Sequence, residues 1–212
     1  MSYTRHERLA YCDALAAAGA DAPTLCAGWT AHDLAAHSVA RERRPDASLG
    51  IVAAPLAGYT DSVRQRVKEQ HFHPELVALL RQGAPWWSPL GEPGLGTLAN
   101  TVEFFVHTED VRRGAASWEP RALTAELQRM LWQRIPLLAR ATLRRAPTGI
   151  VAHSPDGRIL HLRTARVVPT VTVTGPPSEL LLFITGRQRA ARVELDGHET
   201  AVRALSEATL GL

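Results

Sequence analysis

Cysteine is scarce in this sequence, since Cys12 and Cys26 are the only two among 212 residues. Two cysteines without a metal-binding spacing exclude a disulfide framework and a Cys-x-x-Cys metal site. Long apolar runs are also missing: none reaches the length that spans a bilayer, and the N-terminus lacks the apolar core of a signal peptide. We therefore expect a protein of the reducing cytoplasm that has no membrane partner.

Lysine is nearly absent, because Lys68 is the only one among 24 basic side chains. The arginines are spread along the chain, often near Asp or Glu, and the formal net charge is only +3. A nucleic-acid-binding surface needs clustered basic side chains, so we expect no nucleic-acid partner. The apolar share of 45% and the charged share of 21% are those of an ordinary globular protein.

The apolar spacing predicts helices in the first two thirds of the chain and mainly strands after residue 146. The predicted helices of the first part cover residues 4–18, 30–44, 56–69, 74–81, 100–114 and 120–145. The predicted elements of the second part are strands at 150–153, 158–164, 171–174 and 192–196 and helices at 179–185 and 199–208. This order predicts an α+β protein with a helical bundle over residues 1–146 and a small α+β domain over 147–212.

The helix predicted over residues 100–114 carries ionisable groups inside its apolar face. A helix turns by about 100° per residue, which places His107 at about +40° and Asp110 at about −20° from Glu103. Apolar side chains flank this stripe on both sides. A surface helix carries its charges opposite its apolar stripe, and buried carboxylates are costly unless they are paired or bind a metal. The stripe therefore predicts a polar cluster with a function.

Glu103 and His107 are four residues apart, a spacing at which two side chains can bind one metal ion without strain. A third ligand must come from elsewhere in the chain, and His37 on the helix predicted over residues 30–44 is the best candidate. The rival ligands are His32, His71, His73 and the thiol of Cys26. On spacing alone we favour a simpler interpretation, in which Glu103 and His107 form a hydrogen-bonded pair beside a neighbouring loop. For Cys26 the simpler interpretation is a small buried apolar side chain, and for the rival histidines a surface position.

Three segments in this order, 28–37, 103–107 and 175–187, resemble the mycothiol-dependent maleylpyruvate isomerase family, which belongs to the DinB-like metal-binding four-helix bundles. The resemblance spans nearly the whole chain. It implies an N-terminal DinB-like four-helix bundle, a small C-terminal α+β domain, and zinc held by His37, Glu103 and His107. The stretch from Glu103 to Arg113 is most similar to an actinobacterial subgroup and less so to the isomerase itself, which leaves the substrate open.

Two imidazoles and one carboxylate leave a divalent cation with a net charge near +1 and an open coordination position. Such a cation lowers the pKa of a bound water and deprotonates a bound thiol. The resemblance implies the thiol: mycothiol as co-substrate of a transferase or isomerase. The same residues would also suit a metal hydrolase using a metal-bound hydroxide, a non-haem iron site, or a non-catalytic metal-binding module whose fourth ligand is a protein side chain.

Asp110 and Arg41 are candidates for the surroundings of the metal. Asp110 can orient a ligating imidazole or act as a general base, and its structural alternative is an ion pair with Arg112, Arg113 or an arginine of another helix. Arg41, near the His37 face of its helix, can bind a carboxylate or phosphate of a small anionic substrate. Its structural alternative is a solvated cation at a helix end.

The remaining candidates lie farther along the chain. The isomerase family has a functional arginine in its C-terminal domain, and Arg187 is our candidate for this catalytic role, beside Arg189 and Arg192. Trp86 and Trp87 lie in a loop rich in Gly and Pro and are candidates for the wall of a substrate pocket. Their structural alternative is a hydrophobic plug. We expect a small-molecule thiol and a small anionic substrate as partners, and a monomer or a homodimer.

Overall fold

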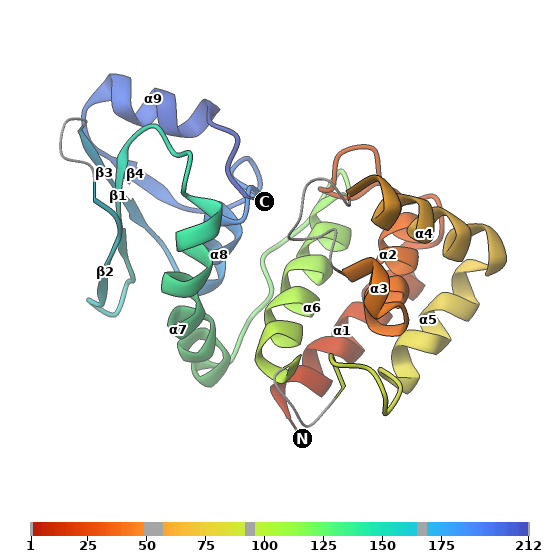
Figure 1. The fold of residues 1–212 in the computed structure, drawn as a ribbon. Helices are drawn as coiled ribbons and strands as arrows, with labels where there is room; N and C mark the ends of the chain where they lie inside the picture. Colours follow the sequence, from red (N-terminus) through yellow and green to blue (C-terminus); the bar gives the residue numbers. More distant parts are fainter. Residues whose placement is uncertain (1, 49–56, 92–95, 165–168, 212) are drawn as a thin grey trace. The chain divides into compact units, whose positions relative to one another are not determined.

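The computed structural model describes residues 2–48, 57–91, 96–164 and 169–211. The chain divides into two compact units, Met1–Pro120 and Arg121–Leu212 (Figure 1). None of the helices within the described residues is long and apolar enough to cross a membrane. The α+β class expected from the sequence is confirmed, with helices throughout and a four-stranded sheet.

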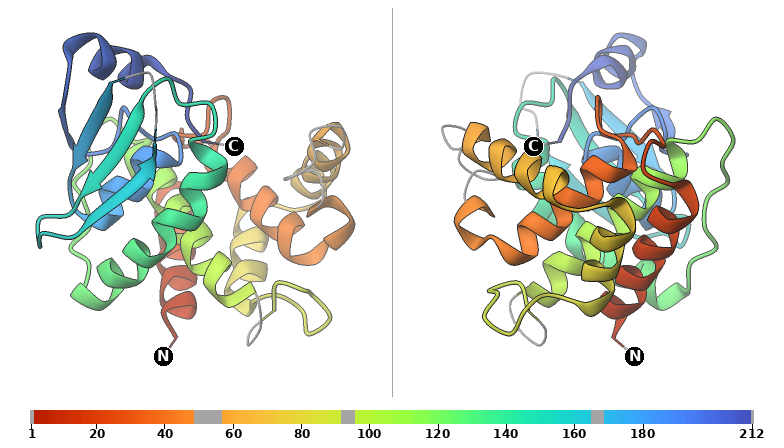
Figure 2. Two further views of the ribbon diagram at one scale, coloured as in Figure 1. Left: turned by 60° about the vertical axis from the view of Figure 1, so that its left-hand side comes forward. Right: turned by 90° about the vertical axis from the view of Figure 1, so that its right-hand side faces the viewer.

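The first unit is helical. Its elements are α1 (Tyr3–Ala18), α2 (Ala31–Arg43), α3 (Pro45–Ser48), α4 (Ala57–Gln70), α5 (His73–Gln82) and α6 (Gly96–Arg113). The helices predicted over residues 4–18, 56–69 and 74–81 are confirmed as α1, α4 and α5. In Figure 2, α1 lies alongside α6, the pair of helices with the most extensive contact in this unit. Helices α1, α2, α5 and α6 share one hydrophobic core, to which each contributes a fully buried side chain: Tyr11, Leu34, Leu76 and Phe104.

Helix α2 begins as the sequence predicts. Thr30 is the N-cap, its side chain accepts the Asp33 backbone N–H, and the Thr30 backbone N–H donates to Asp33 Oδ2 at 3.1 Å. This reciprocal capping box satisfies two backbone donors that the helix itself leaves unpaired. It fixes where α2 starts, and therefore which of its residues face α6.

The loop between α1 and α2 is fixed against the end of α6. The backbone N–H of Leu25 donates to the Asp110 carbonyl at 3.0 Å, and that of Ala31 to the Ala22 carbonyl at 2.9 Å. Gly114 leaves room for this approach, because a Cβ there would collide with the Pro23 carbonyl. The loop thereby brings Cys26 close to the last turns of α6.

The second unit contains the sheet. Its elements are α7 (Ala125–Thr142), β1 (Gly149–His153), β2 (Ile159–Arg163), β3 (Thr170–Thr174), α8 (Pro177–Ile184), β4 (Glu194–Asp196) and α9 (Glu199–Glu207). The strand order is β2-β1-β3-β4, with β1 and β3 parallel and the outer pairs antiparallel. The hairpin expected around Ser154 to Gly157 is confirmed as the β1–β2 turn, where Gly157 adopts a φ of +86° that favours glycine.

The boundary between the units differs from the one expected at residue 146. Helix α7 starts at Ala125, not at Pro120, and its neighbours are α8 and β2. It buries Leu131, Trp132 and Ile135. An amphipathic helix joins the unit that covers its apolar stripe, and the sequence pattern of α7 does not say which unit that is. The division therefore falls before α7, at Pro120.

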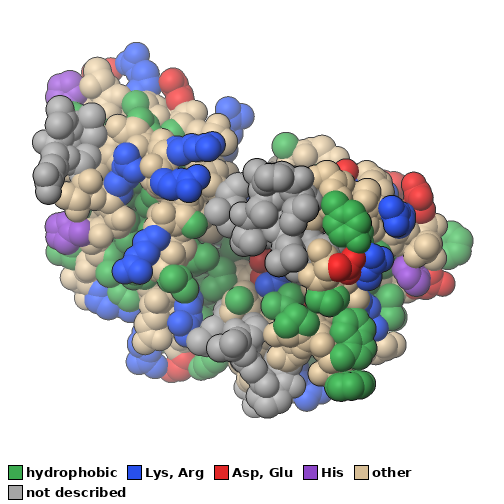
Figure 3. All heavy atoms as spheres, viewed as in Figure 1, with side chains coloured by type: hydrophobic (Ala, Val, Ile, Leu, Met, Phe, Trp, Pro, Cys, Tyr) green, Lys and Arg blue, Asp and Glu red, His purple; other side chains and the backbone are tan. Residues whose placement is uncertain are grey.

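The units carry opposite formal charge. Residues 1–120 contain eleven basic and fourteen acidic side chains, a charge of −3, whereas residues 121–212 contain thirteen and seven, a charge of +6. On the face shown in Figure 3, Lys and Arg side chains recur over the second unit and acidic ones are sparse. The arginines are thus less evenly distributed than their spread along the sequence suggested.

Candidate metal centre

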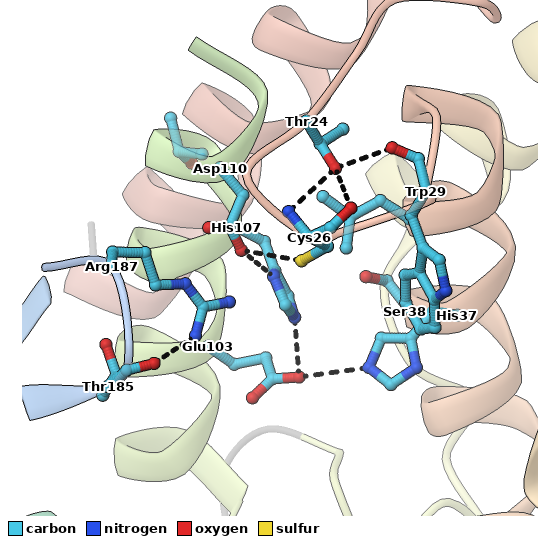
Figure 4. Close-up of polar contacts among 12 residues, drawn as sticks. Thr24, Cys26, Trp29, His37, Ser38, Glu103, His107, Asp110, Thr185 and Arg187 are labelled. Carbon is cyan, nitrogen blue, oxygen red and sulfur yellow. Dashed lines mark hydrogen bonds and ion pairs between the residues drawn. The ribbon is translucent and has the colours of Figure 1, made fainter. Parts of the chain in front are cut away.

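The polar stripe of α6 meets α2 at a group of three potential ligands. His107 Nε2 lies 3.1 Å from Glu103 Oε1, and His37 Nε2 on α2 lies 3.6 Å from the same oxygen (Figure 4). All three potential ligand atoms lie within 4.8 Å of one another. The two imidazole rings stand edge to face, with centroids 5.6 Å apart. The structure thus brings together the three residues for which the sequence predicts a metal site.

These three groups polarise one another. Burial alone would raise the pKa of Glu103, but the charges of Arg41 and His107 outweigh it and hold that pKa well below its usual range. Burial would likewise lower the pKa of His107, but the Glu103 carboxylate and a hydrogen bond to Asp110 raise that pKa well above its usual value. Burial lowers the pKa of His37. In the absence of a metal, the cluster therefore holds an ionised carboxylate between a protonated and a neutral imidazole.

The residues fit a divalent metal. Neutral imidazole and carboxylate are zinc ligands, and with bond lengths near 2 Å two ligand atoms of a tetrahedral ion lie about 3.3 Å apart. The two nitrogen-to-oxygen distances at Glu103 Oε1, 3.1 and 3.6 Å, bracket that value. A cation here would take the place of the positive charge that a protonated His107 supplies, and its binding would release that proton.

Asp110 lies on the other side of the His107 ring. Its Oδ2 is 2.8 Å from His107 Nδ1, and its side chain is fully buried. A carboxylate can only accept, so in the protonated imidazole Nδ1 donates to Asp110 and Nε2 donates to Glu103. A metal ion would take the place of the Nε2 proton and leave the Nδ1 proton on its bond to Asp110. The Asp110 carboxylate therefore forms an ion pair with His107 on the same helix. A ligand histidine is commonly held by a carboxylate in this way.

Cys26 contacts the same carboxylate. Its Sγ donates to Asp110 Oδ2 at 3.4 Å, and Thr24 Oγ1 accepts the Cys26 backbone N–H at 3.2 Å. Cys26, His107 and Asp110 form a second group of three potential ligands within 4.8 Å. The expectation of a small buried apolar side chain was wrong, because the thiol is partly exposed and hydrogen-bonded.

Aromatic rings pack around the two imidazoles. The Trp29 ring lies 5.3 Å from that of His37, and the guanidinium of Arg64 lies 4.7 Å above the indole. The Tyr11 ring lies 6.1 Å from that of His107, and its hydroxyl donates to the Leu34 carbonyl at 3.1 Å. These contacts restrict the rotation of both imidazoles, which keeps their nitrogens directed at Glu103.

Arg41 is also part of this cluster. Its Nε lies 3.4 Å from Glu103 Oε1, its Nη1 donates to Asn100 Oδ1 at 2.7 Å, and its side chain is 10% exposed. The alternative of a solvated cation at a helix end is therefore wrong for Arg41. It describes Arg44 instead, which pairs with Asp46 at the surface.

The rival histidines serve other contacts. His32 Nε2 lies 3.0 Å from the His71 carbonyl, and the His71 imidazole faces Glu75 at the surface. His73 Nε2 donates to the Leu15 carbonyl at 2.9 Å, and its side chain is buried. The expectation of a surface position was wrong for His73, because its N–H satisfies a carbonyl near the end of α1.

The sequence also named Trp86, Trp87 and Arg187 as candidates for the site. Trp86 is 94% exposed and Trp87 48% exposed, so neither indole is enclosed as the wall of a pocket would be. Arg187 belongs to the second unit, where its Nη1 donates to the Thr185 carbonyl at 2.6 Å just beyond α8. Its catalytic role stays a prediction.

Sequence reasoning did not consider Asn100, and it considered Cys26 only as a rival thiol ligand. Asn100 lies one turn before Glu103 on α6, and helical spacing already placed it near the polar stripe. Cys26 gave no such signal, because it lies in a loop whose path depends on contacts with the end of α6.

Comparison with known proteins identifies the fold. No family model matches the chain, and no curated protein matches it. Two crystal structures are similar to it: one of the mycothiol-dependent maleylpyruvate isomerase, with 17% sequence identity and a TM-score of 0.54, and one of a single-residue variant of that enzyme, with 16% and 0.55. Each comparison covers 92% of this chain and 90% of the other. The expected resemblance is thereby confirmed at the level of the fold: this chain folds like the mycothiol-dependent maleylpyruvate isomerase over nearly its whole length.

Proposed function

We propose that His37, Glu103 and His107 hold a divalent cation, zinc by preference, and that the protein is a transferase or isomerase that uses mycothiol as co-substrate. The observation that carries this proposal is the convergence of two imidazole nitrogens on one carboxylate oxygen, from helices distant in the sequence. The similar fold of a mycothiol-dependent isomerase supports the thiol. In this proposal the first unit is a DinB-like bundle whose core helices are α1, α2, α5 and α6.

The residues of the chain have distinct roles in this proposal. A cation bound by two imidazoles and one carboxylate keeps a net positive charge and an open position, and therefore favours the thiolate form of a thiol over the thiol. Asp110 accepts a hydrogen bond from Nδ1–H of His107 and so directs Nε2 towards the proposed metal position. Trp29 and Tyr11 hold the imidazoles in place.

The ligand at the fourth coordination position of the metal distinguishes a catalytic site from a closed structural site. A structural zinc site is completed by four protein ligands. The thiol of Cys26 is a further potential zinc ligand, but it groups with His107 and Asp110, not with His37 and Glu103. This separation favours a position left open for an exogenous ligand.

Metal content and thiol binding test the proposal directly. We expect one equivalent of metal in the purified protein, and a change in the absorption spectrum of the Co²⁺-loaded protein when mycothiol is added. Loss of both properties in His37→Ala would link them to this site. No binding of mycothiol or an analogue at millimolar concentration would overturn the thiol-dependent function. Turnover of esters or amides without added thiol would point to a hydrolase instead.

A further inference from the structure

Arg41 occupies a place in the cluster that the proposed function does not explain. It lies one turn after His37 on α2, and its guanidinium reaches two side chains of α6, Asn100 and Glu103. The Glu103 oxygen that it approaches, Oε1, is the one that also faces both imidazoles. We propose that Arg41 and Asn100 form a positioning pair that orients the Glu103 carboxylate for the metal and connects it to the loop at residues 83–91. This inference rests on the proposed metal site.

Asn100 is suited to fix the position of Arg41. Its side chain is fully buried, its Nδ2 donates to the Leu90 carbonyl at 2.7 Å, and its Oδ1 accepts from Arg41 Nη1 at 2.7 Å. An amide has donors on one side and an acceptor on the other. The Leu90 carbonyl therefore determines which side of the amide faces Arg41.

The loop at residues 83–91 is the starting point of a row of contacts that runs through Asn100 and Arg41 to Glu103. Two backbone hydrogen bonds fold it into successive turns, from Ser88 to the Pro85 carbonyl and from Gly91 to the Ser88 carbonyl, each at 2.9 Å. Hydrogen bonds and one ion pair then lead without interruption from the Leu90 carbonyl to the metal ligand Glu103. This loop carries the exposed Trp86 and Trp87.

The chemistry of the guanidinium explains why the residue is an arginine. A guanidinium is planar and presents its N–H groups in fixed directions, so it can address an amide and a carboxylate at once, whereas an ammonium is a compact point charge. The charge alone would act against the metal, because a cation beside Glu103 repels another cation. Removal of Arg41 should therefore tighten metal binding if only its charge matters, and weaken it if its geometry matters.

The sign of this effect is measurable with Co²⁺, whose affinity and visible spectrum report on the ligands without any enzymatic assay. Partners that hold a metal ligand typically contribute 10- to 100-fold to metal affinity, and we expect Arg41→Ala to weaken Co²⁺ binding by about 10-fold and to change the spectrum. Asn100→Ala should act in the same direction with a smaller effect. The double variant should bind no more weakly than Arg41→Ala, because Asn100 acts through Arg41. Arg41→Lys should restore only part of the affinity.

Arg43→Ala is the matched control. Arg43 is on the same helix, and its Nη2 donates to the carbonyls of Leu79 and Gly83, at the start of the same loop. It therefore supports the loop through hydrogen bonds that do not involve Glu103. We expect Co²⁺ affinity and spectrum in Arg43→Ala to equal those of the unchanged protein.

Four results would overturn the inference alone while the proposed function stands: tighter or unchanged Co²⁺ binding in Arg41→Ala, full restoration by Arg41→Lys, additive effects of Arg41→Ala and Asn100→Ala, or an equal loss in Arg43→Ala. Failure of the unchanged protein to bind Co²⁺ or Zn²⁺ would overturn the proposed function as well. Thermal unfolding of each variant shows whether it is folded. If Arg41→Ala does not fold, the Co²⁺ affinities of Arg41→Lys and Asn100→Ala test the inference in its place.

Discussion

Helix α2 carries two buried polar clusters one turn apart, around Asp33 and around His37, and they balance charge differently. Asp33 Oδ1 accepts from Arg64 Nη1 at 2.5 Å and from Lys68 Nζ at 2.9 Å. His37 instead faces a carboxylate that it shares with a second imidazole. The cations that pair with Asp33 have no lone pair for a metal, whereas Glu103 and His107, which lie beside His37, do. Burial of charge alone therefore does not indicate a metal site.

The two clusters are in contact through one aromatic residue. The Trp29 ring lies 5.3 Å from that of His37 and 4.7 Å from the guanidinium carbon of Arg64. The comparison predicts that substitutions around Asp33 change stability and leave metal binding intact, while substitutions around His107 do the reverse.

The largest effect is expected for His107→Ala. His107 belongs to both groups of three potential ligands, so its removal leaves neither complete. We expect metal binding to fall by more than about 100-fold, measured by calorimetric titration with Zn²⁺. The protein should remain folded. One equivalent of tightly bound metal in this variant would show that the ligands are other residues.

Asp33→Asn tests the structural cluster. It leaves the Arg64 guanidinium, whose side chain is 6% exposed, without its buried carboxylate partner, while the amide oxygen can still accept from Thr30. Breaking a buried ion pair costs about 3 kcal/mol, and we expect a loss of this size in the free energy of unfolding, measured in urea, with unchanged Zn²⁺ affinity.

Asp61→Asn is the control for Asp33→Asn. Asp61 pairs with the same arginine at 2.7 Å, but its side chain is 56% exposed. An exposed ion pair contributes about 1 kcal/mol or less. Equal losses in the two variants would contradict the difference that we draw between buried and exposed partners of Arg64.

Asp110→Asn should weaken the metal site without removing a ligand. An amide in place of the carboxylate no longer holds the Nδ1 proton of His107 by a charged acceptor, and we expect a loss of about 10-fold in Zn²⁺ affinity. Glu109→Gln is the neighbouring control, because Glu109 is equally buried but pairs with Arg113. A similar loss of affinity in Glu109→Gln would mean that any change in buried charge on α6 disturbs the site.

The stability of the protein should also depend on acid pH through Asp33. Burial would raise the pKa of Asp33, but hydrogen bonds from Lys68 and Thr30 lower it to about 2, from 3.8. A lowered folded-state pKa stabilises the protein above the unfolded value, and this contribution, about 2 kcal/mol, is lost as the pH falls from about 4 to about 2. The difference in unfolding free energy between the protein and Asp33→Asn should shrink over this window. A difference that is constant from pH 5 to 2 would contradict it.

Helical spacing placed Glu103, His107 and Asp110 on one face, and in the fold His107 and Asp110 are buried whereas the Glu103 side chain is 28% exposed. Periodicity succeeds here because it depends only on residues within one helix. It failed for His73, which is buried, and for Arg41, which is not solvated, because burial depends on what packs against a helix. It also could not assign α7 to the second unit.

By itself, the sequence determined the α+β class, the capping box of α2 and the polar stripe of α6, all of which arise from interactions between residues close in the chain. Only the tertiary structure decided that His37 faces Glu103, that Cys26 and His107 share the Asp110 carboxylate, and that Arg41 and Asn100 contact one another. These pairs join α2, α6 and the loop before α2, and their distances depend on how the helices pack. Side-chain type limits which partners are possible, and packing selects among them.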